Sequence, residues 1–369
     1  MQNKIIPEGF KEDVSLQAGA EHRFKYIIID CFKSNGFEIV KTPLIEHLNA
    51  KVDDNVLIIV TGKKEKKLNI RDDITLQVAR LSQTRLLKRK KPLKLCYYGE
   101  VVRKKGTMLR PERQFLQIGA ETIGENNFLA DVEIIELAYT TLSLVGIKKI
   151  TIEISSRIFY DKFLNQIKNS NRKKEIKRLI KLKDLKGLLN IVDKKNHHYL
   201  KNLFSCTGIY RDKKNNLKTL GIDKSTSAEI LNIENIITNF SYKKYVDIFL
   251  DLCEIDHKNY HSGVRFTIFA ENVRGEIARG GRYFIEGSDE KNTATGFTCY
   301  MDSILRATSL KLTKKKVIVP FDFPKTKSKD LIKKGYSLVR NTTGAEITKK
   351  LAKDQNCQFY FANNSVNII

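Results

Sequence analysis

The side chains best suited to bind a charged molecule gather in one short stretch of the chain. Residues 99–108, Gly-Glu-Val-Val-Arg-Lys-Lys-Gly-Thr-Met, place three cations together, and residues 113–121 add an amide at Gln117 and a carboxylate at Glu121. Positive charge of this kind suits an anionic substrate or an acidic protein partner. This stretch is the most informative part of the chain.

The spacing of the other reactive residues does not indicate metal or thiol chemistry. The six cysteines are spread singly, without a C-x-x-C pair, and the six histidines show no H-x-x-x-H pattern. Zinc sites and redox-active dithiols usually show such pairs. The sequence thus predicts reduced, mostly buried thiols, no bound metal and no cofactor.

An antiparallel hairpin and a helix are expected to position the polar stretch. Residues 93–103 and 113–123 have the composition of strands, and the polar loop between them contains glycine and proline. This pattern favours a hairpin. A helix is predicted over residues 75–87, with Leu76 among the residues facing inward.

The flanking segments indicate a body that mixes helices with a sheet. Helices are predicted over residues 18–35, 130–144 and 301–310, and strands over residues 37–40, 149–155, 246–252 and 263–273, followed by the glycine-rich residues 279–283. Arg279 and Arg282, beside the glycine pair 280–281, are interpreted as members of structural ion pairs. The fold class is α+β, built on an antiparallel sheet flanked by helices.

Two further parts differ from this body in composition. Residues 157–242 show helical Lys/Leu/Ile periodicity, with a predicted inward stripe of Leu179, Leu182, Leu185, Leu188 and Leu189. A small α/β tail follows the lysines at 314–316. The predicted domains are therefore a body at 1–156 and 243–312, a helical insertion at 157–242 and a tail at 313–369.

The formal charge of +25 does not by itself predict nucleic-acid binding. The lysines are scattered through a chain that is also heavy in Asn and Ile, a bias that base composition of the gene explains. The longest aliphatic runs, such as residues 56–60, are far shorter than the roughly 20 residues that cross a bilayer. The N-terminus has no apolar signal-like region, so we expect a cytoplasmic protein without a membrane span.

Five segments, taken in order, resemble the catalytic domain of class II histidyl-tRNA synthetases. Across roughly residues 5–310 they are residues 70–75, 99–121, 260–263, 280–283 and 295–297. The closer likeness is to a paralogous family, the regulatory subunits of ATP phosphoribosyltransferase, whose R-P-D-x-T sequence replaces the R-P-E-G-T of the synthetases. Residues 71–75, Arg-Asp-Asp-Ile-Thr, follow that variant, with Asp72 in place of its proline.

The resemblance implies that the equipment for adenylation has been replaced. Arg103 matches the arginine that would contact an α-phosphate, but the glutamate two residues later is Lys105 here. Ser303 occupies the position of the arginine that binds the γ-phosphate in the synthetases, and Asp256 occupies the position of their histidine-specific arginine. Reversing a charge beside a phosphate or carboxylate costs several kcal/mol at short range. A working synthetase is therefore not expected.

The resemblance also implies that the amino-acid pocket is retained. The matching residues, expected to bind free histidine, are Asp73, Thr75, Arg103, Gln117, Glu121, Tyr260 and His261. Two carboxylates and an amide suit the fixed positive ammonium of an amino acid, whereas His261 replaces a second tyrosine. The open alternative is a buried polar network that only supports the fold.

By this resemblance the chain is a non-catalytic regulatory subunit in histidine biosynthesis. It would self-associate as a dimer, join a short-form catalytic subunit in a hetero-octamer, activate it, and carry feedback inhibition by free histidine. Two alternatives stay open: a divergent or truncated histidyl-tRNA synthetase, and an RNA-binding paralogue that acts as a sensor. Both would exploit the basic charge of the chain.

Overall fold

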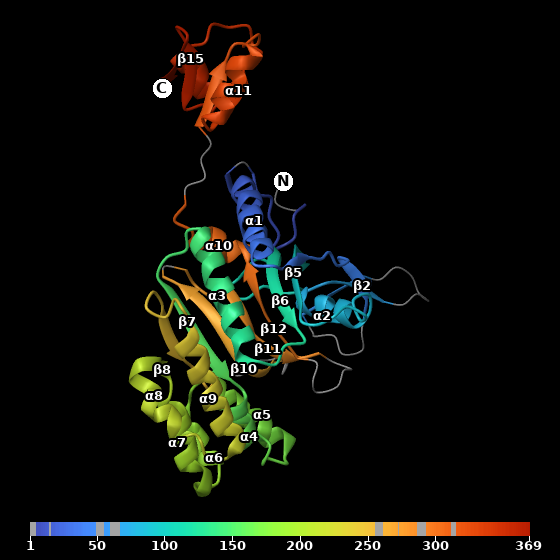
Figure 1. Ribbon diagram of the computed structural model, residues 1–369, viewed down its shortest axis with the longest axis vertical. Helices are drawn as coiled ribbons and strands as arrows, with labels where there is room; N and C mark the ends of the chain where they lie inside the picture. The colour runs from blue at the N-terminus through green and yellow to red at the C-terminus, as the bar shows by residue number, and fades with distance from the viewer. Residues whose placement is uncertain are drawn as a thin grey trace. The chain divides into compact units, whose positions relative to one another are not determined.

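The computed structural model divides into two compact units, Met1–Leu310 and Lys311–Ile369. Figure 1 shows both units coloured along the chain. The structure describes residues 5–14, 16–48, 55–59, 67–254, 261–271, 273–285, 293–310 and 315–369.

The large unit is organised around one sheet, in which nine strands pair within the described residues. In spatial order they are β1 (Glu38–Ile39), β5 (Leu93–Val102), β6 (Gln114–Ile123), β12 (Thr293–Tyr300), β11 (Ala278–Phe284), β10 (His261–Ala270), β7 (Ile150–Ser156), β9 (Asp247–Leu250) and β8 (Gly208–Ile209). The predicted hairpin is confirmed as β5 and β6, which pair antiparallel from Leu93 opposite Ile123 to Val102 opposite Gln114.

The α+β class is confirmed, but the sheet is mixed. The central strands are antiparallel, whereas β1 pairs parallel to β5 and β7 pairs parallel to β9. Both parallel pairs bring together strands that a longer connection separates in the chain, as parallel pairing requires. A second sheet of three short strands lies in the same unit: β2 (Ile45–His47), β4 (Leu68–Ile70) and β3 (Leu57–Ile59).

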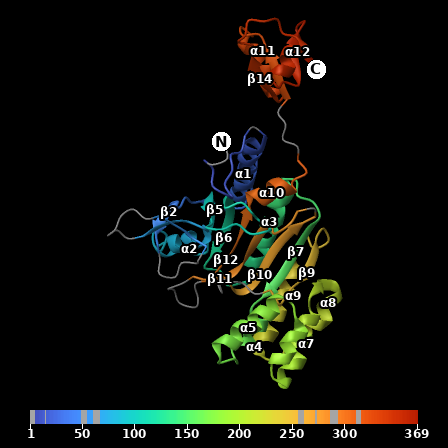
Figure 2. The ribbon, with the colours of Figure 1, turned by 180° about the vertical axis from the view of Figure 1, so that it is seen from behind.

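Helices cover one face of the large sheet (Figures 1 and 2). They are α1 (Leu16–Ser34), α3 (Phe128–Leu144), α9 (Lys224–Asn239) and α10 (Met301–Ala307). Helix α1 confirms the predicted first helix. It ends at Ser34, and Gly36 follows with a φ of 84° that is accessible to glycine without strain. Phe32 of α1 packs edge-on against Phe297 of β12, with ring centroids 5.6 Å apart.

Helix α2 (Thr75–Gln83) lies on the opposite face of the sheet and is shorter than predicted. Val78 and Ala79 are buried against β5 and β6. The prediction for Leu76 is wrong, because its side chain is 53% exposed. Leu76 lies in the first turn of α2, which borders a cavity, so its side chain does not pack against the sheet.

The helical segment 157–242 contains six α-helices and one short strand, β8. The helices are α4 (Ile158–Leu164), α5 (Ser170–Lys181), α6 (Leu185–Ile191), α7 (His197–Ser205), α8 (Tyr210–Lys218) and α9, with a 3-10 turn at Lys194–Asn196. The single leucine stripe is wrong, because Leu182 caps α5 and is 61% exposed, whereas Leu179 and Leu188 are buried. The left-handed Lys183, with φ 57°, turns the chain between two separate helices.

The small unit is an α/β domain with a four-stranded sheet. Its strands lie in the order β14 (Tyr336–Arg340), β13 (Lys315–Val319), β15 (Phe359–Ala362) and β16 (Ser365–Ile368), and its helices are α11 (Lys325–Lys333) and α12 (Lys349–Asp354). Strand β16 was not predicted. Among the described residues of the chain, none of the helices combines the length and the apolar character that a membrane span needs.

A buried ion pair joins the sheet to its helical layer. Arg282 of β11 lies 2.9 Å from the Asp131 carboxylate of α3, and both side chains are less than a tenth exposed. Arg282 also donates to the backbone carbonyls of Glu125 and Asn127. Arg279 pairs with Glu276 at 2.9 Å. The structural ion pairs predicted for both arginines are thus confirmed.

Removing Asp131 should destabilise the large unit strongly. The Asp131→Ala variant leaves the Arg282 guanidinium buried without its carboxylate, which typically costs about 3–5 kcal/mol. Glu133→Ala on the same helix removes the half-exposed pair with Lys94 and should cost about 1 kcal/mol or less. Urea unfolding followed by circular dichroism measures the free energy of unfolding of both variants. Equal decreases in the two variants would contradict a strongly stabilising ion pair between Arg282 and Asp131.

Candidate functional site

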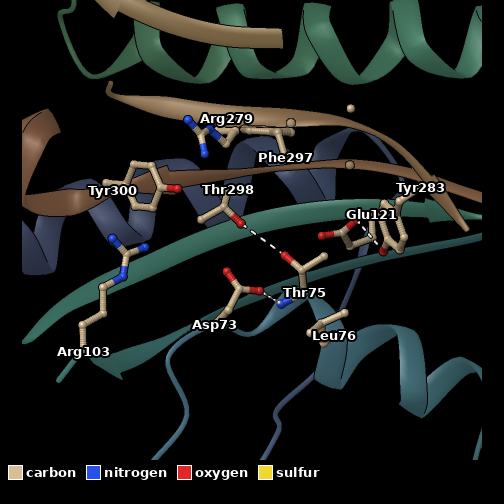
Figure 3. A pocket seen from close by; sticks show the side chains of 13 residues that line it. Asp73, Thr75, Leu76, Arg103, Glu121, Arg279, Tyr283, Phe297, Thr298 and Tyr300 are labelled. Atoms are coloured by element: carbon tan, nitrogen blue, oxygen red, sulfur yellow. Dashed lines mark hydrogen bonds between the residues drawn. The ribbon is translucent and has the colours of Figure 1, made fainter. Parts of the chain in front are cut away.

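A cavity of about 140 Å³ opens on the face of the sheet away from α1 and α3. Engineered cavities of similar size hold one ring-sized molecule. Because side chains alternate between the faces of a strand, alternate residues of β6, β11 and β12 point into it, and α2 closes it from the side. Its lining residues are Asp73, Thr75, Leu76, Arg103, Glu121, Arg279, Gly280, Gly281, Tyr283, Gly296, Phe297, Thr298 and Tyr300 (Figure 3).

Glu121 lies at the buried end of the cavity, held by two tyrosines. The Tyr97 hydroxyl donates to its Oε1 at 3.2 Å, and the Tyr283 hydroxyl donates to its Oε2 at 3.0 Å. The neighbouring strand carries Gly296, where a Cβ atom would collide with the Glu121 carboxyl group. The glycine therefore provides the space that this carboxyl group occupies.

The Tyr97 hydroxyl links Glu121 to the start of α2. It lies 2.9 Å from Thr75 Oγ1 and 2.6 Å from Thr298 Oγ1, and it donates its one proton to Glu121. A phenol has one donor and two acceptor positions, so this hydroxyl is saturated. The two threonines then act as donors toward it, and their oxygens remain available as acceptors.

Burial raises the pKa of the Glu121 carboxyl group to about 8. The Tyr283 hydroxyl opposes the shift by stabilising the carboxylate, the charge of Asp73 reinforces it, and the Tyr97 hydroxyl opposes it again. Burial also raises the pKa of Tyr97. The deep end of the cavity therefore holds a neutral carboxyl group near pH 7, while Asp73 supplies the negative charge closer to the opening.

Asp73 is fixed by the backbone and by a buried amide. Its Oδ1 accepts from the Thr75 amide at 2.8 Å, and its Oδ2 accepts from Gln117 Nε2 at 3.1 Å. The Gln117 oxygen in turn accepts from the Ile74 amide at 3.1 Å. Gln117 is completely buried and orients Asp73, without lining the cavity itself.

Arg103 provides positive charge at the other side of the cavity, as Figure 3 shows. Its guanidinium lies over the rings of Phe115 and Tyr300, at 5.0 and 6.0 Å from their centroids. No carboxylate of the described residues forms an ion pair with it, in contrast to Arg279, which pairs with Glu276. The cavity thus has a carboxyl-rich side and a cationic side, which suits a small zwitterion.

The structure brings four of the seven predicted site residues together as cavity walls: Asp73, Thr75, Arg103 and Glu121. Gln117 lies directly behind Asp73. Tyr260 is outside the described residues, and His261 begins β10 with its backbone opposite Tyr283.

Sequence reasoning missed four further residues of the site: Tyr97, Tyr283, Thr298 and Tyr300. Placing Tyr97 on the same face as Glu121 needs the pairing register of β5 and β6, in which Leu95 lies opposite Glu121 and Tyr97 opposite Gly119.

The positions that resembled lost nucleotide ligands have other contacts here. Lys105 is exposed, and Asp256 is outside the described residues. Ser303 is buried at the start of α10, where its hydroxyl accepts from Arg110 at 3.2 Å. Arg110 also pairs with Asp302 at 3.2 Å. Arg110 thus binds Asp302 and Ser303 at the position where the resemblance places the γ-phosphate arginine of the synthetases.

The sheet, its helical layer and the polar cavity on the open face define a class II aminoacyl-tRNA synthetase-like protein. The family model of histidyl-tRNA synthetase matches residues 9–304, and the chain belongs to that family. Among curated proteins, the ATP phosphoribosyltransferase regulatory subunit of Rhodospirillum centenum is 29% identical over 99% of this chain and 96% of its own length. The resemblance to these regulatory subunits is thereby confirmed.

Solved structures agree on the fold. An ATP phosphoribosyltransferase regulatory subunit/histidyl-tRNA synthetase from Bacillus halodurans aligns with a TM-score of 0.79 at 20% identity, covering 98% of both chains. A chain of the ATP phosphoribosyl transferase (HisG:HisZ) complex from Thermotoga maritima aligns with a TM-score of 0.60 at 20% identity, covering 76% of this chain and 97% of that one. At these identities the likeness concerns the fold alone.

The raised pKa of Glu121 should appear in the pH dependence of stability. The folded group takes up its proton near pH 8, whereas the ordinary carboxyl does so near 4.5. Its stabilising contribution is therefore full below about pH 4.5 and is lost as the pH rises through 8. The free energy of unfolding of the native protein, relative to Glu121→Gln, should fall across this window by up to about 1.4 kcal/mol per pH unit.

Urea midpoints of both proteins between pH 4 and pH 9 measure this difference. Glu346→Gln, at an exposed position of the small unit, serves as the control. Parallel pH profiles for native protein and Glu121→Gln would show that Glu121 titrates in the ordinary range.

Proposed function

We propose that the chain is a non-catalytic regulatory subunit of ATP phosphoribosyltransferase, which activates a short-form catalytic subunit and mediates its feedback inhibition by histidine. The names of its curated relatives support this role. The observation that carries it is the cavity itself. Asp73 and Arg103 line it and suit an amino acid, whereas Ser303 replaces the arginine that binds the γ-phosphate in the synthetases. We further propose that the chain acts in the cytoplasm, with its partner.

The charges of the cavity match free histidine in one orientation. The ammonium group lies beside Asp73, where the carboxylate is held ready by Thr75 and Gln117. The carboxylate of the ligand faces Arg103, which has no ion-pair partner among the described residues. The imidazole ring reaches the deep end, where the neutral Glu121 carboxyl group and its tyrosines form hydrogen bonds with ring nitrogens.

A divergent histidyl-tRNA synthetase is the alternative, and the contacts of α10 weigh against it. Adenylation concentrates negative charge on a bent triphosphate, which needs cations that are free to pair with it. Here Arg110 is neutralised by Asp302 and Glu276. Lys105 replaces the glutamate of the synthetases. The third possibility, an RNA-binding sensor, would require tRNA affinity that persists at physiological salt.

Regulation of this kind needs little energy. If histidine binds the inhibited assembly more tightly than the active one, a coupling of about 1–3 kcal/mol corresponds to a difference of about 5- to 150-fold in its affinity for the two states. We further propose that the chain dimerises and that the assembly with the catalytic subunit is a hetero-octamer.

Histidine at millimolar concentration should raise the melting temperature of the purified chain by several degrees. A ligand that binds only the folded state stabilises it by mass action, by about 2.7 kcal/mol at a hundredfold excess over Kd. Asp73→Asn keeps the shape of the side chain but removes its charge, and should abolish the shift. Asp72→Asn, at the adjacent residue outside the cavity lining, is the matched control and should keep it.

Addition of the chain to a short-form catalytic subunit should activate ATP phosphoribosyl transfer, and histidine should reverse the activation. The chain alone should not catalyse histidine-dependent exchange of pyrophosphate into ATP. Both assays use the full-length protein, with an authentic histidyl-tRNA synthetase as positive control for exchange. Robust exchange, together with no effect on the transferase, would favour the synthetase alternative.

A further inference from the structure

The connection between β5 and β6 carries exposed apolar side chains that do not line the cavity. We call residues 104–109 the finger, and all six of them are exposed. Met108 is 101% exposed and Leu109 is 58% exposed. Two neighbouring apolar side chains in water gain nothing for the isolated chain. Methionine is, however, enriched at protein interfaces because its flexible thioether adapts to a partner.

The finger is rigidly built, although its tip is exposed. The Thr107 amide donates to the Arg110 carbonyl at 2.6 Å, and the Arg110 amide donates back to the Thr107 carbonyl at 3.1 Å. A Cβ atom at Gly106 would collide with the Pro111 carbonyl, so the turn is compact. Arg110 is buried and bound to Asp302. A contact surface that is already ordered loses little conformational entropy when a partner binds.

The base of the finger is also held from its other side. The amides of Lys104 and Lys105 donate to the carbonyl and side-chain oxygens of Asn55, at 2.7 and 2.9 Å. The Arg113 amide donates to the Gly9 carbonyl at 2.7 Å. Three separate segments of the chain thus fix a loop whose tip touches little else, which is the arrangement of a docking element and not of a disordered connection.

The finger is joined to the cavity through Tyr300. Arg103, which precedes the finger, and Arg110, which follows it, both lie over the Tyr300 ring, at 6.0 and 3.8 Å from its centroid. Both also lie over Phe115, at 5.0 and 5.2 Å. Arg103 and Tyr300 line the cavity. A ligand that pairs with Arg103 therefore acts on a residue directly adjoining the finger.

The charge of the finger indicates the chemistry of its partner. Lys104 and Lys105 flank the apolar tip, and no carboxylate among the described residues forms an ion pair with either. Aliphatic side chains offer no ring on which a nucleic-acid base could stack. The complementary surface is an apolar hollow with an acidic rim on another protein.

We propose that the finger docks into such a hollow on the short-form catalytic subunit, so that occupancy of the cavity alters the docking. This inference rests on the proposed regulatory function. Met108 and Leu109 supply the buried centre of the contact, and the two lysines supply its charged rim.

The double variant Met108→Asp, Leu109→Asp tests the proposal in the full-length protein. Isothermal titration with the catalytic subunit should give a Kd about 30-fold higher or more, as for hot-spot residues. Its melting temperature and its histidine-induced shift should match those of the native chain. Leu231→Asp on α9, where the side chain is also 58% exposed, is the matched control and should bind like the native chain.

The possible outcomes separate the two proposals. If the native chain binds and activates the catalytic subunit while the double variant binds within about threefold of it, the finger is not the docking element and the regulatory function stands. If the native chain neither binds nor activates the subunit, both proposals fail. Loss of tRNA binding in the variant, with transferase binding intact, would assign the finger to RNA instead.

Discussion

The burial of one carboxyl group, Glu121, constrains the whole open face of the sheet. A carboxyl group away from water must have hydrogen-bond partners, and here the hydroxyls of Tyr97 and Tyr283 provide them. Each tyrosine comes from a different strand, so β5, β6 and β11 must keep one register for the contacts to form. The glycine of β12 opposite Glu121 leaves the required volume. Fold and recognition chemistry thus depend on the same few contacts.

The two faces of the large sheet have different roles: one packs against helices and the other forms the cavity. On the helical face, Arg282 and Asp131 lock β11 to α3, and the apolar contacts of Phe32 and Phe297 fill the layer. On the open face, the next residue along β11, Tyr283, reaches into the cavity. Because neighbouring residues of one strand point to opposite faces, the helical layer fixes the position of side chains that line the cavity. A rigid strand supports a more exact binding geometry than a loop does.

The fold was largely predictable, because long elements with clear periodicity decide it. The hairpin of β5 and β6 and helix α1 were expected almost to the residue. The short elements were not: Leu182 was placed in a continuous stripe because no sequence signal marks the left-handed turn at Lys183. Asp73 and Glu121 followed from a resemblance of motifs, whereas Tyr97 and Thr298 needed the pairing register of β5, β6 and β12. Such register depends on tertiary packing, which local composition does not contain.

Under the proposed function the cavity binds an amino acid without catalysis, and the contrast between its two sides supports this. Recognition of a small zwitterion needs fixed charges that are satisfied before the ligand arrives, as Asp73 is by Thr75 and Gln117. Stabilising a triphosphate in a transition state needs unpaired cations as well. The charge of Arg110 is neutralised by Asp302, and this ion pair stiffens the connection between β5 and β6. Ser303, at the position of the γ-phosphate arginine of the synthetases, also accepts a hydrogen bond from Arg110. This position therefore contributes to the structure of the connection and supplies no cation.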